Sequence, residues 1–131
     1  MTLGEFVAMA LYQGGLPNVY SAPPSADECA EPIVCGLAAF DRVVSARKHR
    51  RGEAKVTVRV CRVDAREGYE AACECERALN RASWLTAVAS RVRVCGLECG
   101  MPYFEKVDES GRYVWAVDAT VTVEVADAQE G

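Results

Sequence analysis

The clearest pattern in the sequence is a strict alternation of apolar and polar residues near its end. One face of an extended chain there would carry Tyr113, Trp115, Val117, Ala119, Val121, Val123 and Val125. Side chains of a strand alternate between its two faces, so this period of two predicts one long β-strand with an apolar side. Thirteen residues extend over roughly 43 Å, whereas the usual strand has about 5–6 residues. We therefore expect this strand to overhang its own sheet, leaving unpaired backbone and apolar surface for a neighbouring subunit.

Further segments have strand patterns. Residues 55–63 alternate, with valines on one face and Lys55, Thr57 and Arg59 on the other, and residues 91–98 alternate again. The apolar run 33–40 fits a strand that is buried on both faces. Residues 103–107 precede a turn at 108–111, where Gly111 can adopt a positive φ, and together with the last strand they predict a hairpin.

Two segments have helical signals. Thr2 and Glu5 form a capping box in front of apolar residues, which predicts a helix over 3–13. Asp64 and Glu67 repeat this signal and predict a second helix over 66–82. One face of the second helix is charged, with Glu67, Glu70, Glu74, Arg77 and Arg81, and the opposite face is small, with Gly68, Ala72, Cys75, Leu79 and Ala82. This small face predicts close packing on a sheet.

Together these elements predict an α+β fold. We expect a twisted, mainly antiparallel sheet of four to five strands, with two helices packed on it and a long C-terminal β-hairpin. The chain has 131 residues, which suits one domain over 1–131. The polar residues 126–131 are expected to be disordered.

The net charge of −4 disfavours general binding to nucleic acids. One segment is strongly basic in spite of the negative net charge. It is a predicted loop over 47–53, between two strand patterns, and it contains Arg47, Lys48, Arg50 and Arg51. Such a run is usually a solvated loop, but it could also contact phosphates of DNA or an acidic neighbouring subunit. Charge reversal of the four residues would separate the solvated loop from the two functional interpretations.

Candidate chemistry is sparse. The single histidine, His49, lies in the basic segment without an orienting carboxylate nearby in sequence, so a Cys–His enzyme is not expected. Cys95 and Cys99 have three residues between them, as in some zinc sites, but on the predicted strand they would lie about 13 Å apart. The seven cysteines are therefore expected to be reduced, partly buried thiols. We expect no enzymatic activity, no cofactor and no metal. With no apolar run of about 20 residues and no secretory signal, a cytoplasmic protein without a membrane partner is expected.

Two stretches resemble a known family. The first is the valine strand 56–62 followed by Tyr69-Glu70-Ala71-Ala72, and the second runs from Met101 to Val123 through Asp108-Glu109-Ser110-Gly111-Arg112-Tyr113. Both are similar to small tail-terminator and minor capsid proteins of tailed bacteriophages and prophages. The resemblance covers about residues 54–125 well and the first helix weakly.

The resemblance implies a structural protein of the virion, assembled in the cytoplasm of the bacterial host. Its subunits would form a ring, usually hexameric and often from monomers, that ends the tail tube and joins it to the head. Partners would be other copies, the tail-tube protein, a head-completion or connector protein and, transiently, packaged DNA. Since aromatic residues dominate interface centres, the expected subunit interface comprises Tyr103, Phe104, Tyr113, Trp115 and Val117. Two alternatives stay open: another connector or tail-completion position, and a metal- or thiol-dependent host protein that uses the cysteines.

Overall fold

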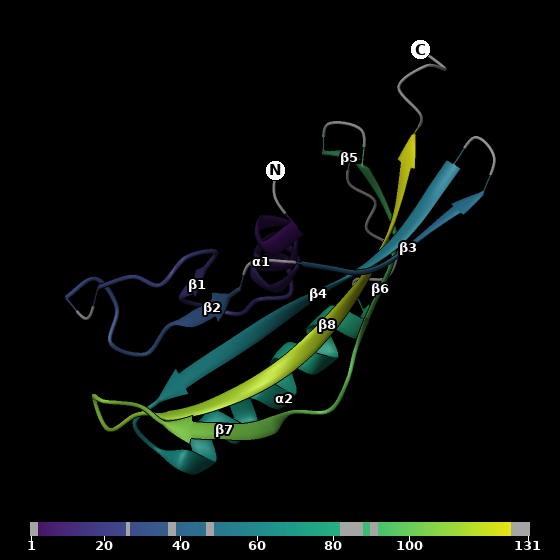
Figure 1. Cartoon of the computed structure of the whole chain (residues 1–131). Coiled ribbons are helices and arrows are strands. Elements are labelled where there is room, and N and C mark those ends of the chain that lie inside the picture. Colours follow the sequence, from purple (N-terminus) through teal and green to yellow (C-terminus); the bar gives the residue numbers. More distant parts are fainter. Residues whose placement is uncertain are drawn as a thin grey trace.

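The computed structural model describes residues 3–25, 27–36, 39–46, 49–81, 88–89 and 92–126 and has the predicted α+β architecture (Figure 1). The elements in chain order are α1 (Leu3–Gln13), β1 (Val19–Tyr20), β2 (Ile33–Cys35), β3 (Ala39–Ala46), β4 (His49–Arg62), α2 (Ala65–Arg81), β5 (Val88–Ala89), β6 (Val92–Cys99), β7 (Tyr103–Val107) and β8 (Tyr113–Ala126). No helix in these described ranges is long and apolar enough to cross a membrane.

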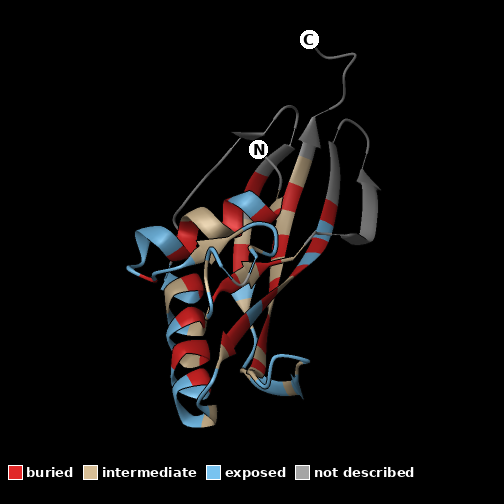
Figure 2. Cartoon of the chain, turned by 90° about the vertical axis from the view of Figure 1, so that its left-hand side faces the viewer, coloured by how far each residue is buried: buried red, intermediate tan, exposed pale blue. Residues whose placement is uncertain are grey.

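The described strands form one twisted sheet of eight. The main order is β1-β2-β4-β8-β6-β5, while β3 pairs with β4 and β7 pairs with β8. Every pairing is antiparallel except that of β1 with β2, so the mainly antiparallel prediction is confirmed. The strand number exceeds the predicted four to five, because the short strands β1 and β5 have no periodic pattern to reveal them and the run 33–40 contributes to two strands, β2 and β3. Both helices lie on the same face of the sheet (Figures 1 and 2).

The long strand β8 lies in the centre of the sheet. Each of its residues from Tyr113 to Ala126 faces a residue of β4, from Arg62 back to His49. On its other side β6 pairs with 119–125 and β7 pairs with 113–116. The expected overhang with unpaired backbone is therefore wrong, because β4 is as long as β8 and matches it along its whole length. The strand also continues to Ala126, and residues 127–131 of the predicted tail lie outside the described residues.

Two other boundaries differ from the prediction. The apolar run 33–40 is divided between β2 and β3. β2 ends at Cys35, and the backbone N–H of the next residue, Gly36, donates a hydrogen bond to the Thr57 carbonyl oxygen. The predicted basic loop is also wrong in part, since β4 already begins at His49 and includes Arg50 and Arg51. These charged residues are in a strand because β3 and β8 supply backbone partners on both sides of it. Arg47 and Lys48 lie outside the described residues.

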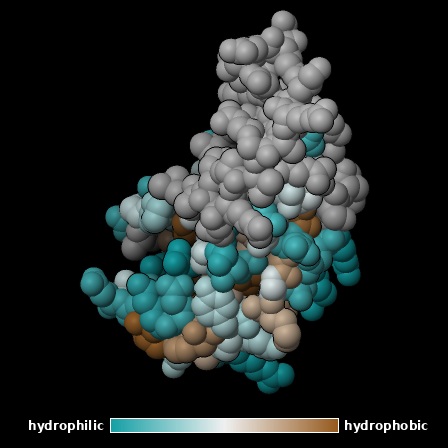
Figure 3. All heavy atoms as spheres, turned by 45° about the vertical axis from the view of Figure 1, so that its right-hand side comes forward, coloured by the Kyte–Doolittle hydropathy of each residue, from teal (hydrophilic) through white to brown (hydrophobic). Residues whose placement is uncertain are grey.

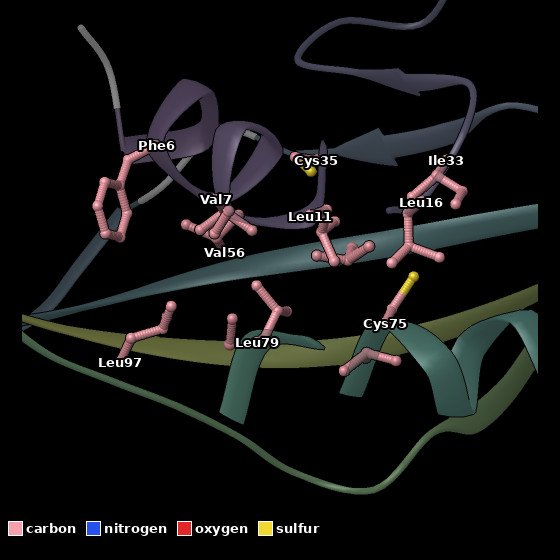
Figure 4. Close-up of a cluster of buried hydrophobic side chains, with 14 of the residues drawn as sticks. Phe6, Val7, Leu11, Leu16, Ile33, Cys35, Val56, Cys75, Leu79 and Leu97 are labelled. Atoms are coloured by element: carbon pink, nitrogen blue, oxygen red, sulfur yellow. The ribbon is translucent and has the colours of Figure 1, made fainter. Parts of the chain in front are cut away.

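The core lies between the helices and the sheet (Figure 4). The predicted apolar face of β4 is buried, as is the face of β8 that runs from Val117 to Val123. Phe6 and Leu11 of α1 and Leu79 of α2 cover these strands. The predicted capping of α2 is confirmed, because the Asp64 carboxylate accepts a hydrogen bond of 2.9 Å from the backbone N–H of Glu67, and the helix begins at Ala65, one residue before the predicted start.

The small face of α2 is also confirmed. Its buried residues are Gly68, Ala71, Ala72, Cys75 and Leu79, and Ala82 lies outside the described residues. Small side chains let the helix backbone approach the sheet, so α2 lies directly over β4 and β8.

Candidate interaction surface

The predicted interface residues fall into three environments. Tyr103 and Phe104 are well exposed, at 44% and 47%, and Tyr113 and Trp115 are half-buried. Val117 is fully buried in the core, so its assignment to a surface interface is wrong. The reason is that α2 covers the middle of β8 but leaves the end near Tyr113 less covered.

Three of these residues meet on the helix-bearing face of the sheet. The Phe104 ring lies 5.5 Å from the Trp115 ring and 6.2 Å from the Tyr113 ring, measured between centroids. From α2, Tyr69 packs edge-on against Trp115 at 5.1 Å. We call the group Tyr69, Phe104, Val107, Tyr113 and Trp115 the aromatic patch; Val107 pairs with Tyr113 and is 51% exposed. Edge-on packing of this kind adds about 0.5–1.5 kcal/mol per pair to the gain from burial.

Exposed apolar residues are concentrated in β7 and directly before it. Among the described residues, seven large hydrophobic side chains are exposed, and four of them lie within 101–107: Met101, Tyr103, Phe104 and Val107. Tyr69 is a fifth, at 43%. Figure 3 shows apolar residues at the surface of this lower part of the molecule, among hydrophilic ones. A concentration of this kind is typical of a protein interaction site.

Gly68 positions the aromatic patch. A Cβ atom at this glycine would lie 2.7 Å from Cδ1 of Trp115, closer than real Cβ contacts allow. The indole ring therefore occupies the space that a side chain at position 68 would fill. Tyr69 was not among the residues predicted from the sequence. The feature that could have identified it is its position next to Gly68, at the border of the small face of α2.

Tyr103 faces the opposite side of the sheet and takes part in a polar network. Its hydroxyl donates to the Asp118 carboxylate at 3.2 Å, and the Thr57 hydroxyl donates to the same carboxylate at 2.9 Å. Desolvation and the nearby Asp118 raise the pKa of Tyr103, so the phenol keeps its proton and remains a donor. Arg59 pairs with Glu105 at 2.9 Å. These contacts tie the edge strand β7 to the central strands.

The hairpin turn is held by Asp108. Its carboxylate accepts hydrogen bonds from the backbone N–H groups of Ser110 and Arg112 and from the Arg112 guanidinium, at 3.0, 2.9 and 2.8 Å. Gly111 has the predicted positive φ, 79°. Arg112 also donates to the carbonyl oxygen of Ala30 at 2.9 Å, which joins the turn to the loop before β2. The turn that connects Val107 and Tyr113 of the aromatic patch is thus fixed from two sides.

Asp108 is expected to make the stability of the protein depend on pH in the acid range. Desolvation acts to raise its pKa, but the hydrogen bonds from Arg112 and Ser110 outweigh it and hold the pKa below the usual value of 3.8. A depressed folded-state pKa means that the stabilisation is present above the unfolded pKa and is lost as pH falls through the folded one. Asp108→Ala should lower the free energy of unfolding at pH 7 by about 1 kcal/mol. Urea unfolding from pH 7 to pH 2 would measure this.

The variant should also show less loss of stability below pH 4 than the wild type. Glu109→Ala, on the neighbouring exposed turn residue, is the matched control and should follow the wild-type profile. Equal acid sensitivity of the Asp108→Ala variant and the wild type would contradict a role for this carboxylate.

Arg50 and Arg51 of the predicted basic segment lie at the end of the sheet away from the aromatic patch. In the strand register, Arg51 of β4 and Arg93 of β6 lie opposite Glu124 of β8, one on each side of it. The sheet therefore places Arg93 two strands away from Arg51 of the predicted basic segment. Sequence analysis did not connect Arg93 with Arg50 and Arg51, because their proximity depends on pairing across β8.

The cysteines in the core have the properties of buried apolar residues. Burial raises the pKa of Cys35, Cys75 and Cys99 to about 12, so these groups are protonated thiols at neutral pH. Metal ligation and nucleophilic attack both require the thiolate. Within the described ranges no three histidine, cysteine or acidic side chains are grouped to hold a metal ion.

Comparisons with known proteins find similarity among solved structures. No protein-family model matches the sequence, and no curated protein matches it. Among solved structures, a chain of the virion of a native gene transfer agent particle is similar, with a TM-score of 0.73 and 18% sequence identity. The similarity covers 94% of this chain and 95% of that chain. The two chains therefore share their fold over nearly their whole lengths.

Proposed function

We propose that this protein is a structural component of a phage-like virion, and that it acts as a tail terminator. The observation that supports this most is the fold shared over 94% of the chain with a component of a gene transfer agent virion. The sequence resemblance to tail-terminator and minor capsid proteins is independent of that comparison. Both point to a protein that works by assembling with others.

In this proposal the aromatic patch is the subunit interface. Desolvated aromatic side chains supply much of the binding energy in protein interfaces, and Phe104, Tyr113 and Trp115 already form a preorganised cluster. A heterologous contact that is repeated by a suitable rotation closes into a ring, such as a hexamer. The ring would cover the last polymerising surface of the tail tube and offer its other side to a head-completion or connector protein. Assembly would take place in the cytoplasm of the bacterial host.

The basic end of the sheet has two roles compatible with the proposal. The guanidinium groups of Arg47, Arg50 and Arg51 and the ammonium group of Lys48 would contact phosphates of DNA that passes through the ring, or carboxylates of a neighbouring subunit. Because the net charge of the chain is −4, either contact would be confined to this basic segment.

A second candidate is another connector or tail-completion position in the same particle, because the shared fold is equally compatible with it. The thiol- or metal-dependent host protein is less well supported. The raised pKa values of Cys35, Cys75 and Cys99 are opposite to what that chemistry needs.

The test is deletion of the gene from a strain that produces the particles. We expect free heads together with unjoined tails of irregular length in negative-stain electron microscopy, and recovery of joined particles when the wild-type gene is supplied. A chain with Phe104→Ser should not restore joining, whereas Tyr12→Ser, which changes an aromatic residue 75% exposed on α1, should restore it. Joined particles with normal tails after deletion would overturn the proposal, and tails of regular length that remain unjoined would favour the connector.

A further inference from the structure

Arg62, the last residue of β4, lies at the base of the aromatic patch. It pairs with Tyr113 of β8, and its side chain is on the same face of the sheet as Val60, which pairs with Trp115. A Cβ atom at position 68 would lie 3.5 Å from Cβ of Arg62 and 2.7 Å from Cδ1 of Trp115. Arg62 and the indole ring therefore lie side by side under the first turn of α2.

This arginine has no partner among the described residues. Its Nε atom is buried and makes no hydrogen bond there, and the same is true of the indole Nε1 of Trp115. Arg62 takes part in no ion pair within the described ranges, whereas three other arginines at this end of the molecule each bind a carboxylate. These pairs are Arg59 with Glu105 at 2.9 Å, Arg66 with Glu70 at 3.1 Å and Arg112 with Asp108 at 2.8 Å.

The unpaired guanidinium of Arg62 is unfavourable in the free subunit. A buried N–H group that has lost water without gaining an acceptor lowers stability, and more so when the group is charged. Nε is the one nitrogen of Arg62 that is buried without a partner, and the residue as a whole is half-buried, so its two terminal nitrogens face the solvent. A planar guanidinium with an open outer end fits a carboxylate, which accepts two parallel hydrogen bonds.

The surroundings of Arg62 favour a carboxylate of a protein over a phosphate of DNA. Binding to the DNA backbone uses several unpaired cations, but the nearby Arg66 and Arg112 are already paired. The neighbouring side chains of the aromatic patch exclude water, as the centre of a protein interface does. A second copy of this chain supplies suitable acids, since the chain has 19 acidic and 15 basic residues. Glu67 and Glu74, for example, are exposed and form no ion pair within the described ranges.

We infer that Arg62 binds a carboxylate of the neighbouring copy through its two terminal nitrogens, while apolar side chains of that copy cover the aromatic patch. This inference rests on the proposed function, because it takes the patch as the subunit interface. The arginine is unpaired in the free subunit and gains its partner only on assembly. A protein without a carboxylate at the matching place would bury the charge unpaired, so Arg62 selects the correct neighbour.

Arg62→Met separates this role from a structural one. Methionine is apolar and unbranched and removes the unpaired Nε donor, so the urea midpoint of the purified variant should equal or exceed that of the wild type. When supplied to the deletion strain, the same variant should give at least about tenfold fewer joined particles, because each interface loses its ion pair. Arg62→Lys should restore joining in part, since lysine keeps the charge but not the two-point contact.

The matched control is Arg77→Met, which changes an exposed arginine further along α2 and should restore joining like the wild-type gene. A urea midpoint of Arg62→Met clearly below that of the wild type would show that the arginine stabilises the fold, and would overturn the inference. Joining by Arg62→Met at the wild-type level would overturn it as well.

A charge exchange identifies the source of the carboxylate. Arg62→Glu should give no joined particles, because it places two acids opposite each other. Each acidic residue of the chain is then changed to lysine in the Arg62→Glu background, and the variants are screened for joined particles. We expect one such change, for instance Glu67→Lys or Glu74→Lys, to restore joining, and the same change should not rescue Phe104→Ser. Failure of every change would overturn the neighbouring copy as the partner of Arg62.

The outcomes separate this inference from the proposed function. If Arg62→Met joins heads and tails normally while deletion of the gene still leaves them unjoined, the proposed function stands and the role of Arg62 is removed. Normal joining after deletion would remove both.

Discussion

Replacing Val117 with aspartate is expected to remove the folded state. The side chain is fully buried in the core between α2 and the central strand β8. A carboxylate there would lose its hydration without gaining a partner, and the loss should reach about 4 kcal/mol or more, a large part of the stability of a domain of this size. The soluble yield and the circular dichroism spectrum of the variant would show the unfolded chain.

A milder change gives a measurable value. Val117→Thr keeps the shape but buries a hydroxyl group, and should lower the free energy of unfolding by about 1–3 kcal/mol in urea titrations. Phe104→Ser is the matched comparison, because its side chain is 47% exposed, and should cost about 1 kcal/mol or less. If Val117→Thr were as stable as the wild type, the core position of Val117 would be refuted and its predicted place in an interface would regain support.

Gly68→Val is expected to destabilise the protein by about 3 kcal/mol. The added Cβ would lie 2.7 Å from Cδ1 of Trp115, so either the helix or the indole ring must move. The helical preference of valine over glycine is a gain of well under 1 kcal/mol and cannot compensate for this. Urea unfolding followed by far-ultraviolet circular dichroism would measure the loss, and tryptophan fluorescence would report the displaced indole.

The control variants separate the clash from a general effect of losing a glycine. At Gly100 an added Cβ meets nothing within 4 Å, so Gly100→Ala should change stability by less than about 0.5 kcal/mol. In a double-mutant cycle, Trp115→Leu should reduce the cost of Gly68→Val by at least about 1 kcal/mol, because the clashing ring is gone. Additive costs would show that Gly68 is not needed to accommodate Trp115.

Local features of the fold could be predicted from the sequence. The capping residue Asp64, the small face of α2 and the alternation of β4 and β8 are each determined within a few residues, so their patterns identify helix, strand and buried face. The hairpin turn was predictable for the same reason, since Gly111 has the positive φ that such a turn requires.

Pairing between distant segments could not be predicted. The alternation of apolar and polar residues predicts which side of β8 is buried but not which strands lie beside it. Its central position between β4 and β6 was therefore not predicted. The charged run at 49–51 has no apolar period, and it is a strand because β3 and β8 pair with it. Local propensity is a weak guide where two neighbours supply the backbone hydrogen bonds.

The candidate site was predicted in part. Aromatic composition identified Phe104, Tyr113 and Trp115, which the structure brings together. It also included Val117, because residues 115 and 117 share a face of β8 and only the position of α2 separates the half-buried ring from the core valine. Tyr69 completes the cluster from another element, which no pattern within one strand could indicate.

Because β8 is the last strand to be synthesised, the centre of the sheet is completed last. Residues 49–62 leave the ribosome with β2 and β3 on one side, but their longest partner is about 60 residues further along the chain. Until that partner emerges, one edge of β4 and the apolar side of α2 that packs on β8 stay uncovered. Long-range pairing of this kind slows folding and favours aggregation of incomplete chains. We therefore expect nascent chains stalled before Tyr113 to bind chaperones, and release of the strand 113–126 to complete the sheet in a single late step.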